Sequence, residues 1–234
     1  MTERLVFKVF GYTEEQIRAA LSSEGITPLS VEVDCLDATL ALSADSSERE
    51  DTTLRVYAIF PGCLYREGEG TLAETVLERL RLYNAKLCVA ESLTGGMIAS
   101  MLVDVPGCSE SFLEGIVCYS NESKMVRLGV SPRTLEREGA VSEEVACQMA
   151  SGLMRPGVNY AISTTGIAGP GGGSEKKPVG LVYIGVADDF KCEATECRFE
   201  GTRDEVRRMA AYTALYLLWK RLVKPIDFEN MVIE

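Results

Sequence analysis

Serine and lysine side chains fall at two expected junctions between a strand and a helix. Ser92 follows an apolar run that ends at Ala90, shortly before a helix is expected to begin. Lys124 lies at the second junction, after Tyr119, where Asn121 is expected to cap the next helix. Open α/β sheets bind their ligands at the carboxyl ends of the strands. The two segments together are therefore typical of serine–lysine catalysis, in which Ser92 attacks a carbonyl carbon and Lys124 removes its proton.

The complete absence of histidine limits the chemistry further. A serine nucleophile in this chain has no imidazole to act as its base, and no metal can be held by histidine ligands. A lysine in the first turn of a helix lies near the positive end of the helix dipole, which together with burial lowers its pKa from the usual value of about 10.4. A lysine whose pKa falls to roughly 7–8 can serve as a general base. The backbone amides near Thr94, Gly95 and Gly96 are then expected to stabilise the developing oxyanion.

Each of these features also has a purely structural interpretation. Serine and threonine cap helices far more often than they act as nucleophiles, so Ser92 and Thr94 are also typical of capping residues. Lys124 is equally consistent with a solvated surface lysine. Metal binding is not expected, because acidic residues are numerous but form no clustered ligand set and no calcium-loop spacing.

Two further segments are suited to anions. Residues 163–174 leave an expected strand and contain several glycines, among them Gly166, Gly169 and Gly171, whose backbone amides can approach an anion closely. They match neither common nucleotide-binding glycine pattern, and a flexible surface loop remains the alternative. Arg203 and Arg207 lie one helical turn apart and suit a phosphate group. A charged helix face that pairs with neighbouring acidic residues explains the same spacing.

The chain divides into two expected parts on either side of a glycine-rich hinge at residues 68–70. Residues 1–67 predict a small α+β domain, and residues 71–234 alternate helices with strands, which is typical of an α/β fold with a layered sheet. The expected strands of the small domain are 5–9, 29–33, 38–42 and 54–60, around a helix over 13–22. In the second domain we expect strands over 86–90, 115–119, 159–164, 180–188 and 193–199, and helices over 71–84, 95–104, 122–128, 132–139, 143–153 and 203–223. Helix starts are marked by Thr13, Ser142, and a capping box of Thr202 and Glu205.

Composition places the protein among folded chains that do not bind nucleic acid. With 24 basic and 35 acidic residues the formal net charge is −11, the opposite of the balance that readers of a phosphate backbone usually carry. No apolar stretch is long enough for a bilayer span and no signal peptide opens the chain, so we expect a soluble, cytoplasmic protein with no membrane partner. The eight cysteines form no CxxC pair and are expected to be reduced thiols.

Four sequence blocks, in this order, resemble the C-terminal domain of the CinA family, the nicotinamide-nucleotide amidases: AESLTGG from Ala90, YSNESK from Tyr119, TGIAGPGGGSEKKPVG from Thr165 and GTRDEVRR from Gly201. The resemblance covers residues 71–223 and implies a three-layer α/β/α fold. Residues 1–67 resemble more loosely the KH-like domain that precedes it in longer members, although they are acidic and lack the GxxG loop with which such domains bind nucleic acid. The large N-terminal domain of those members is absent from this sequence.

The resemblance implies hydrolysis of the carboxamide of nicotinamide mononucleotide to nicotinic acid mononucleotide and ammonia, a step of pyridine-nucleotide recycling that needs no cofactor. It assigns Ser92 as the nucleophile, Lys124 as the base and Tyr119 as a hydrogen-bonding or proton-relay neighbour. Ser109 falls on a pocket serine of the family. The remaining implied or expected substrate contacts are Thr94, Gly95, Asn121, Thr165, Gly166, Gly169, Gly171, and Arg203 or Arg207 on the 5′-phosphate. A homodimer is also implied.

Two other kinds of protein fit the same sequence. A nucleotide-binding or regulatory module would keep the pocket and bind a mononucleotide without releasing ammonia. An interaction subunit would use residues 1–67 to dock a separately encoded chain that carries the missing N-terminal domain. Ammonia release by the purified protein separates an amidase from the first of these, and a requirement for another chain would reveal the second.

Overall fold

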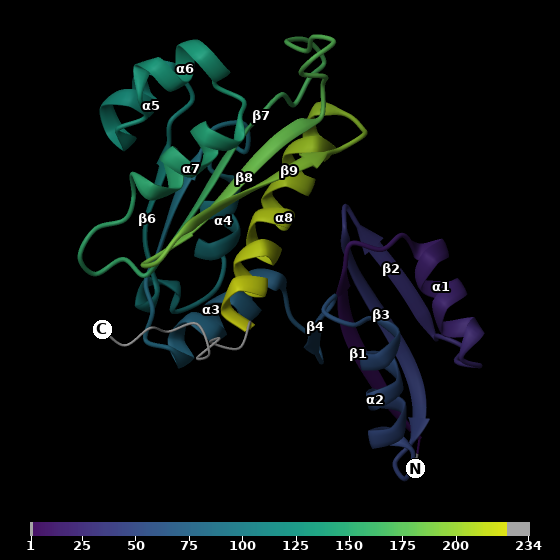
Figure 1. Cartoon of the computed structure of the whole chain (residues 1–234). Helices are drawn as coiled ribbons and strands as arrows, with labels where there is room; N and C mark the ends of the chain where they lie inside the picture. The colour runs from purple at the N-terminus through teal and green to yellow at the C-terminus, as the bar shows by residue number, and fades with distance from the viewer. Residues whose placement is uncertain (1, 224–234) are drawn as a thin grey trace.

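The protein contains two β-sheets, one in each part of the chain (Figure 1). The computed structural model describes residues 2–223, so the end of the predicted second part, which reaches residue 234, lies outside the described residues. The first sheet is antiparallel, in the order β2-β3-β1-β4, and carries two helices on one face. Its elements are β1 (Thr2–Phe10), α1 (Glu14–Ser23), β2 (Ser30–Asp34), β3 (Asp37–Asp45), α2 (Arg49–Ile59) and β4 (Leu64–Glu67).

The second sheet has five strands in the order β6-β5-β7-β8-β9. They are β5 (Leu87–Glu91), β6 (Phe112–Val117), β7 (Tyr160–Gly166), β8 (Leu181–Asp188) and β9 (Cys192–Arg198). β5 is parallel to β6 and to β7, whereas β7, β8 and β9 run antiparallel to one another in turn. One face is covered by α3 (Leu72–Leu82), α4 (Met97–Val103) and α8 (Arg203–Val223), and the other by α5 (Asn121–Leu128), α6 (Pro132–Glu138) and α7 (Glu143–Ser151). The predicted three-layer α/β arrangement is therefore confirmed.

The first unit departs from prediction over residues 54–60, which alternate like a strand but belong largely to α2. Within this segment only Val56 and Phe60 are buried, at the i, i+4 spacing of one helix face, whereas Leu54 and Tyr57 are exposed. The preceding polar residues, expected to be a connection, form the first turn of this helix. The sheet edge is taken instead by β4, whose four residues are too few to show a clear alternation.

Helix starts follow the predicted capping residues with one exception. The caps confirmed are Thr13, Ser142, and the reciprocal bonds between Thr202 and Glu205. α5 is capped by Ser120, which has extended backbone and whose hydroxyl accepts the amide of Ser123. The predicted cap Asn121 is instead the first helical residue. Serine and asparagine are both good helix caps, so the sequence alone does not indicate which of these two neighbouring residues caps α5.

α8 is shared between the two units and lies between the large sheet and the first unit in Figure 1. Phe10 of β1 stacks on Tyr216 of α8, with ring centroids 4.2 Å apart. Near the start of α8, Arg208 forms an ion pair with Asp34 at the end of β2. The helix that carries the two predicted phosphate-binding arginines therefore also packs against the first unit.

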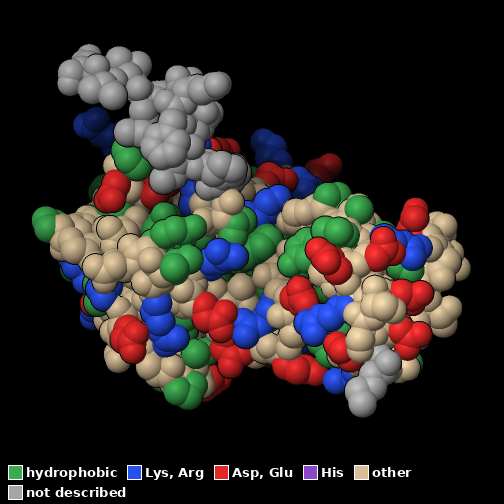
Figure 2. Space-filling view, turned by 90° about the horizontal axis from the view of Figure 1, so that it is seen from below, with side chains coloured by type: hydrophobic (Ala, Val, Ile, Leu, Met, Phe, Trp, Pro, Cys, Tyr) green, Lys and Arg blue, Asp and Glu red, His purple; other side chains and the backbone are tan. Residues whose placement is uncertain are grey.

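Charged side chains of both signs are interspersed on the face shown in Figure 2, without a continuous basic area. This mixture accords with a chain in which acidic residues outnumber basic ones by 35 to 24. Over residues 2–223, no helix has the length and apolar character needed to cross a bilayer.

Gly152 follows α7 and packs against the end of α5, the helix that carries Lys124. A Cβ atom on Gly152 would overlap the carbonyl oxygen of Leu128, and a main-chain atom cannot turn aside as a flexible side chain does. We therefore expect Gly152→Ala to lower the free energy of unfolding by about 1–3 kcal/mol, measured by urea denaturation. The matched control is Gly171→Ala, whose methyl group meets no atom within 4 Å and should change it by less than about 0.5 kcal/mol. Equal stability of the two variants would contradict this packing.

Candidate active site

Ser92 and Lys124 are brought together by strands that end side by side. Glu91, the last residue of β5, lies opposite Val117 of β6 on one side and Thr164 of β7 on the other. The residues that follow these positions meet at one edge of the sheet. There, Ser92 Oγ lies 3.0 Å from Lys124 Nζ. Both residues are buried, with 7% and 1% of their surface exposed.

The Lys124 amine is surrounded by neutral acceptors and forms no ion pair with a carboxylate of the described residues. Besides Ser92 Oγ, its Nζ contacts the carbonyl oxygens of Cys118 at 2.9 Å and Tyr119 at 3.0 Å. A neutral amine can donate its two N–H groups to these carbonyls, which directs its lone pair towards the serine hydroxyl. Burial lowers the pKa of Lys124, an effect that the neighbouring Cys118 thiol opposes. Lys124 is therefore not a solvated surface lysine, and its amine faces a candidate nucleophile.

A buried carboxylate fixes the loop that carries Ser92. Glu91 is 1% exposed and accepts hydrogen bonds from the amides of Gly96 (2.9 Å), Ile98 (3.2 Å) and Ala99 (2.9 Å). Amides at the start of a helix lack partners within it, and a carboxylate there also complements the helix dipole. The expectation that the Gly96 amide faces an oxyanion is therefore wrong, because this N–H donates to Glu91.

Arg207 holds the other side of the same loop. Its Nε donates to the carbonyl oxygen of Leu93 at 2.9 Å, and its Nη2 donates to that of Thr94 at 3.0 Å. The hydroxyl of Thr94 is in turn hydrogen-bonded to that of Thr164 at 2.8 Å. Arg207 therefore braces the serine loop through Nε and Nη2, and its contact with a phosphate stays a prediction.

A pocket of about 200 Å³ contains the Ser92–Lys124 pair. Its lining combines this pair with apolar side chains and one arginine, namely Ser92, Leu93, Tyr119, Lys124, Ala140, Val141, Thr165, Gly166, Ala168 and Arg203. Drug-sized ligands occupy about 300–1,000 Å³. The smaller volume found here suits a compact planar group, with the rest of a larger molecule extending outwards. Of the predicted site residues, the pocket brings together Ser92, Tyr119, Lys124, Thr165, Gly166 and Arg203.

Arg203 and Tyr119 form the exposed side of the pocket. Arg203 Nη1 donates to the carbonyl oxygen of Gly169 at 2.7 Å, and Nη2 donates to the Tyr119 hydroxyl at 3.3 Å. Tyr119 is 63% exposed, and it contacts Lys124 through its backbone carbonyl rather than through its hydroxyl. A guanidinium in this position suits an anionic part of a ligand.

The other predicted residues lie outside the pocket. Ser109 is exposed in the short 3₁₀ helix Cys108–Glu110, at the amino end of β6, whereas Ser92 follows the carboxyl end of the parallel strand β5, roughly 15 Å along the sheet. Within one chain the structure therefore does not bring Ser109 to the site. Also absent from the lining are Thr94, Gly95, Asn121, Gly169 and Gly171. Among residues 2–223, no group of three or more histidine, cysteine, aspartate or glutamate side chains is placed to hold a metal ion.

The second unit carries both the site and the match to a known family. Residues 69–222 match the family described as the CinA C-terminal domain. This chain belongs to the CinA family. The matched range includes every residue that lines the pocket, so the family assignment and the candidate active site concern the same unit.

Two relatives show how far the similarity extends. A CinA-like protein of Fusobacterium nucleatum is 49% identical over 162 residues, which are 68% of this chain and 40% of that protein. A Clostridium perfringens protein, named among the competence-damage inducible proteins, is 50% identical over 162 residues, which are 69% of this chain and 39% of that protein. The chain thus spans about two fifths of the length of these curated relatives.

Solved structures of the CinA superfamily share the architecture. A competence/damage inducible protein from Agrobacterium tumefaciens is 41% identical with a TM-score of 0.61, covering 63% of this chain and 91% of its own. A CinA superfamily protein from Escherichia coli is 34% identical with a TM-score of 0.61, covering 63% of this chain and 87% of its own. The mixed α/β fold is therefore that of known CinA superfamily structures.

Sequence reasoning indicated the Ser92–Lys124 pair but missed residues that hold and enclose it. Glu91 lies within the AESLTGG block, at the end of β5 and ahead of α4, and an acidic residue ahead of a helix start is a usable signal. Ala140 and Val141 carry no such signal, because two small apolar residues between helices look like an ordinary connection. Their place in the pocket depends on how the α6–α7 connection packs against the end of β7.

Glu91→Gln keeps the shape of the side chain but replaces one accepting oxygen by an amide that only donates. An amide at the start of α4 then loses its acceptor, so we expect the free energy of unfolding to fall by about 2–3 kcal/mol. Urea denaturation measures the change. Glu136→Gln, at an exposed position of α6, is the control and should shift stability by less than about 0.5 kcal/mol. If both variants were equally stable, the carboxylate would not be what holds this helix start.

Proposed function

We propose that this CinA-family protein is an amidohydrolase that converts nicotinamide mononucleotide to nicotinic acid mononucleotide and ammonia. The observation that carries the proposal is the 3.0 Å contact between Ser92 Oγ and the buried Lys124 amine. In a chain without histidine a serine nucleophile needs another base, and a buried lysine of lowered pKa can supply one. The choice of substrate is supported by the four motif blocks and by the character of the pocket.

The pocket suits an aromatic carboxamide joined to an anionic group. Its volume of about 200 Å³ can accommodate a pyridine ring with its carboxamide. Leu93, Ala140 and Val141 offer the ring apolar walls, as is usual in small-molecule sites. Arg203, on the exposed side, is the guanidinium that we assign to the 5′-phosphate. The ribose would then lie between the two, across the opening of the pocket.

The proposed reaction passes through an acyl-enzyme. Lys124, neutral before the attack, accepts the hydroxyl proton of Ser92 while Oγ bonds to the carboxamide carbon and an electron pair moves onto the carbonyl oxygen. Lys124 then transfers the proton to the leaving nitrogen, the C–N bond breaks and ammonia departs. Lys124 next takes a proton from water as the water attacks the ester. The ester bond breaks, Ser92 Oγ regains its proton from Lys124, and the carboxylic acid product is released.

The oxyanion of each tetrahedral intermediate needs hydrogen-bond donors, and we assign the amide of Leu93, which lines the pocket, to it. The amides of Gly96, Ile98 and Ala99, at the start of α4, are bonded to Glu91. The Leu93 amide donates to no acceptor within the described residues. One such donor contributes about 2.7–4 kcal/mol to stabilising a transition state.

Ammonia release from nicotinamide mononucleotide by the purified protein tests the proposal. We expect turnover by the wild type, and a loss of roughly three orders of magnitude or more in Ser92→Ala and in Lys124→Met, which keeps bulk but removes the base. Free nicotinamide, which lacks the phosphate that Arg203 would bind, should be the poorer substrate. A folded wild-type protein that binds the nucleotide without releasing ammonia would contradict the amidase and support the binding module.

The pH dependence of kcat/KM for nicotinamide mononucleotide reports the protonation of Lys124 in the free protein. Only the neutral amine accepts a proton, so kcat/KM should rise with pH and level off below about pH 10.4, since burial lowers the pKa of Lys124. Between the lowered and the ordinary pKa, the unfolded chain binds a proton that the folded chain does not. Wild type should therefore gain stability relative to Lys124→Met as the pH rises through that range. A kcat/KM that falls with rising pH there would argue against a neutral Lys124.

A further inference from the structure

The connection between α6 and α7 forms one wall of the pocket without belonging to a helix or a strand. Ala140 and Val141 line the pocket, and Gly139 begins the connection with a φ of +71°. Backbone carbonyls outside regular structure need partners from elsewhere when they are shielded from water. The side chains that bond to these carbonyls therefore fix the position of this wall of the pocket.

Two side chains from β7 and the glycine-rich loop after it bond to these carbonyls. Thr165 Oγ1 donates to the carbonyl oxygen of Ala140 at 2.7 Å. Lys177 Nζ donates to the carbonyl oxygen of Glu138 and, at 2.6 Å, to that of Val141. The ammonium group therefore bridges the two ends of the connection, and the threonine holds its middle.

Lys177 is itself held in place by its own loop. Its amide donates to Ser174 Oγ at 3.1 Å, and the amide of Ser174 donates to the carbonyl oxygen of Lys177 at 2.8 Å. Lys177 is partly buried and does not line the pocket. Its charge is directed at carbonyl oxygens, and hydrogen bonds from a charged donor are stronger than those between neutral groups.

We propose that Lys177 is a positioning residue that fastens residues 139–141 against the pocket and thereby sets the affinity for the substrate. Without Lys177, only the Thr165 bond to Ala140 would hold this wall against the ring that packs on it. Lys177 makes no hydrogen bond to Ser92 or Lys124, so the serine–lysine chemistry does not depend on it. The kinetic consequence rests on the proposed function, whereas the fastening rests on the contacts alone.

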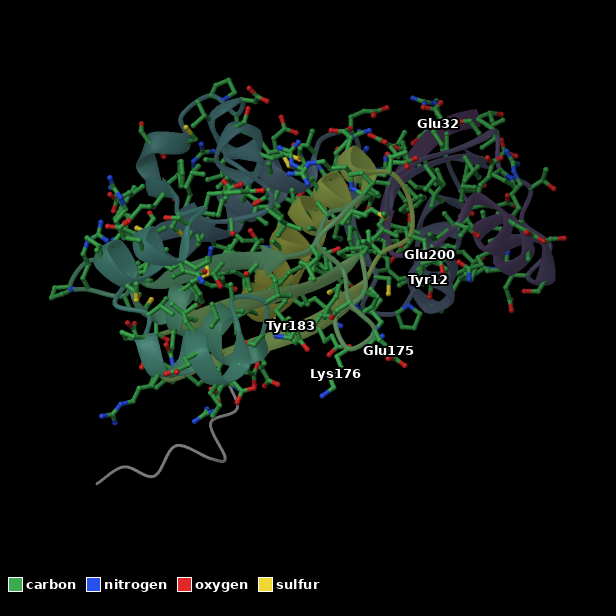
Figure 3. The ribbon with its side chains drawn as sticks, turned by 90° about the horizontal axis from the view of Figure 1, so that it is seen from above. Tyr12, Glu32, Glu175, Lys176, Tyr183 and Glu200 are labelled. Carbon is green, nitrogen blue, oxygen red and sulfur yellow. The ribbon has the colours of Figure 1, made fainter. Side chains whose placement is uncertain are left out.

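Lys176 provides a matched control. It has the same side chain one position earlier and is exposed. In Figure 3, Glu175 and Lys176 lie at the outer end of the loop and point away from the body of the protein. Replacing either lysine by methionine removes one positive charge from the same loop, but only Lys177→Met removes the bonds to the α6–α7 connection.

Backbone amide hydrogen exchange of residues 139–142 measures the fastening directly. We expect these amides to exchange about tenfold faster in Lys177→Met than in wild type, and at the wild-type rate in Lys176→Met. Lys177→Gln, which keeps a neutral side-chain N–H donor, should give an intermediate exchange rate. It replaces Lys177→Met in this test if the methionine variant does not fold. This readout needs neither substrate nor turnover. Wild-type exchange rates in the folded Lys177 variants would overturn the proposal.

Steady-state kinetics with nicotinamide mononucleotide measure the consequence for the site. In Lys177→Met, KM should rise about tenfold while kcat stays within about twofold, because the lost interaction contributes to binding rather than to the chemical step. Titration calorimetry with the same nucleotide should show an equal loss of affinity when Lys177→Met is added to Ser92→Ala. A fall in kcat with an unchanged KM would overturn the proposal. If wild type bound the nucleotide but released no ammonia, the amidase proposal alone would fail. Weaker nucleotide binding and faster amide exchange in Lys177→Met would still uphold the role of Lys177.

Discussion

A lysine amine buried without a carboxylate partner among residues 2–223 is the constraint on which the arrangement of the site depends. Burying an ammonium ion costs far more than burying an amine, so these surroundings favour the neutral form of Lys124. Its N–H partners are the carbonyls of Cys118 and Tyr119, which become available where the chain leaves β6 and turns into α5. The strand end and the helix start that Ser120 caps therefore create the environment of this amine.

The serine side of the site is ordered by two charges that act on backbone groups. Glu91 accepts hydrogen bonds from amides on one side of the loop, and Arg207 donates to carbonyls on the other. The bonds from Arg207 join the last of the four motif blocks to the first. This framework lies in the second unit. It falls within residues 69–222, the range that matches the CinA C-terminal domain.

The parts of this structure that sequence could predict are those determined locally. Apolar runs followed by capping residues located the strand–helix junctions at which Ser92 and Lys124 lie, and α8 begins at the predicted residue, Arg203. Residues 54–60 were misjudged because an alternating pattern in a short segment also fits a helix of which one face is buried. The bracing role of Arg207 could not be predicted, because its partners, Leu93 and Thr94, lie more than a hundred positions away in the chain. Spacing along one helix carries no information about such contacts.

The burial of Glu91 makes the order of the serine loop less sensitive to dissolved salt. Exposed ion pairs such as Arg4–Glu69, whose side chains are 58% and 69% exposed, weaken as ionic strength rises, because counter-ions screen charges that face the solvent. The bonds from Glu91 to the amides of α4 lie where counter-ions do not enter. The surface of this chain, with its net charge of −11, will respond to the surrounding electrolyte. The buried carboxylate that orders its serine loop will respond far less.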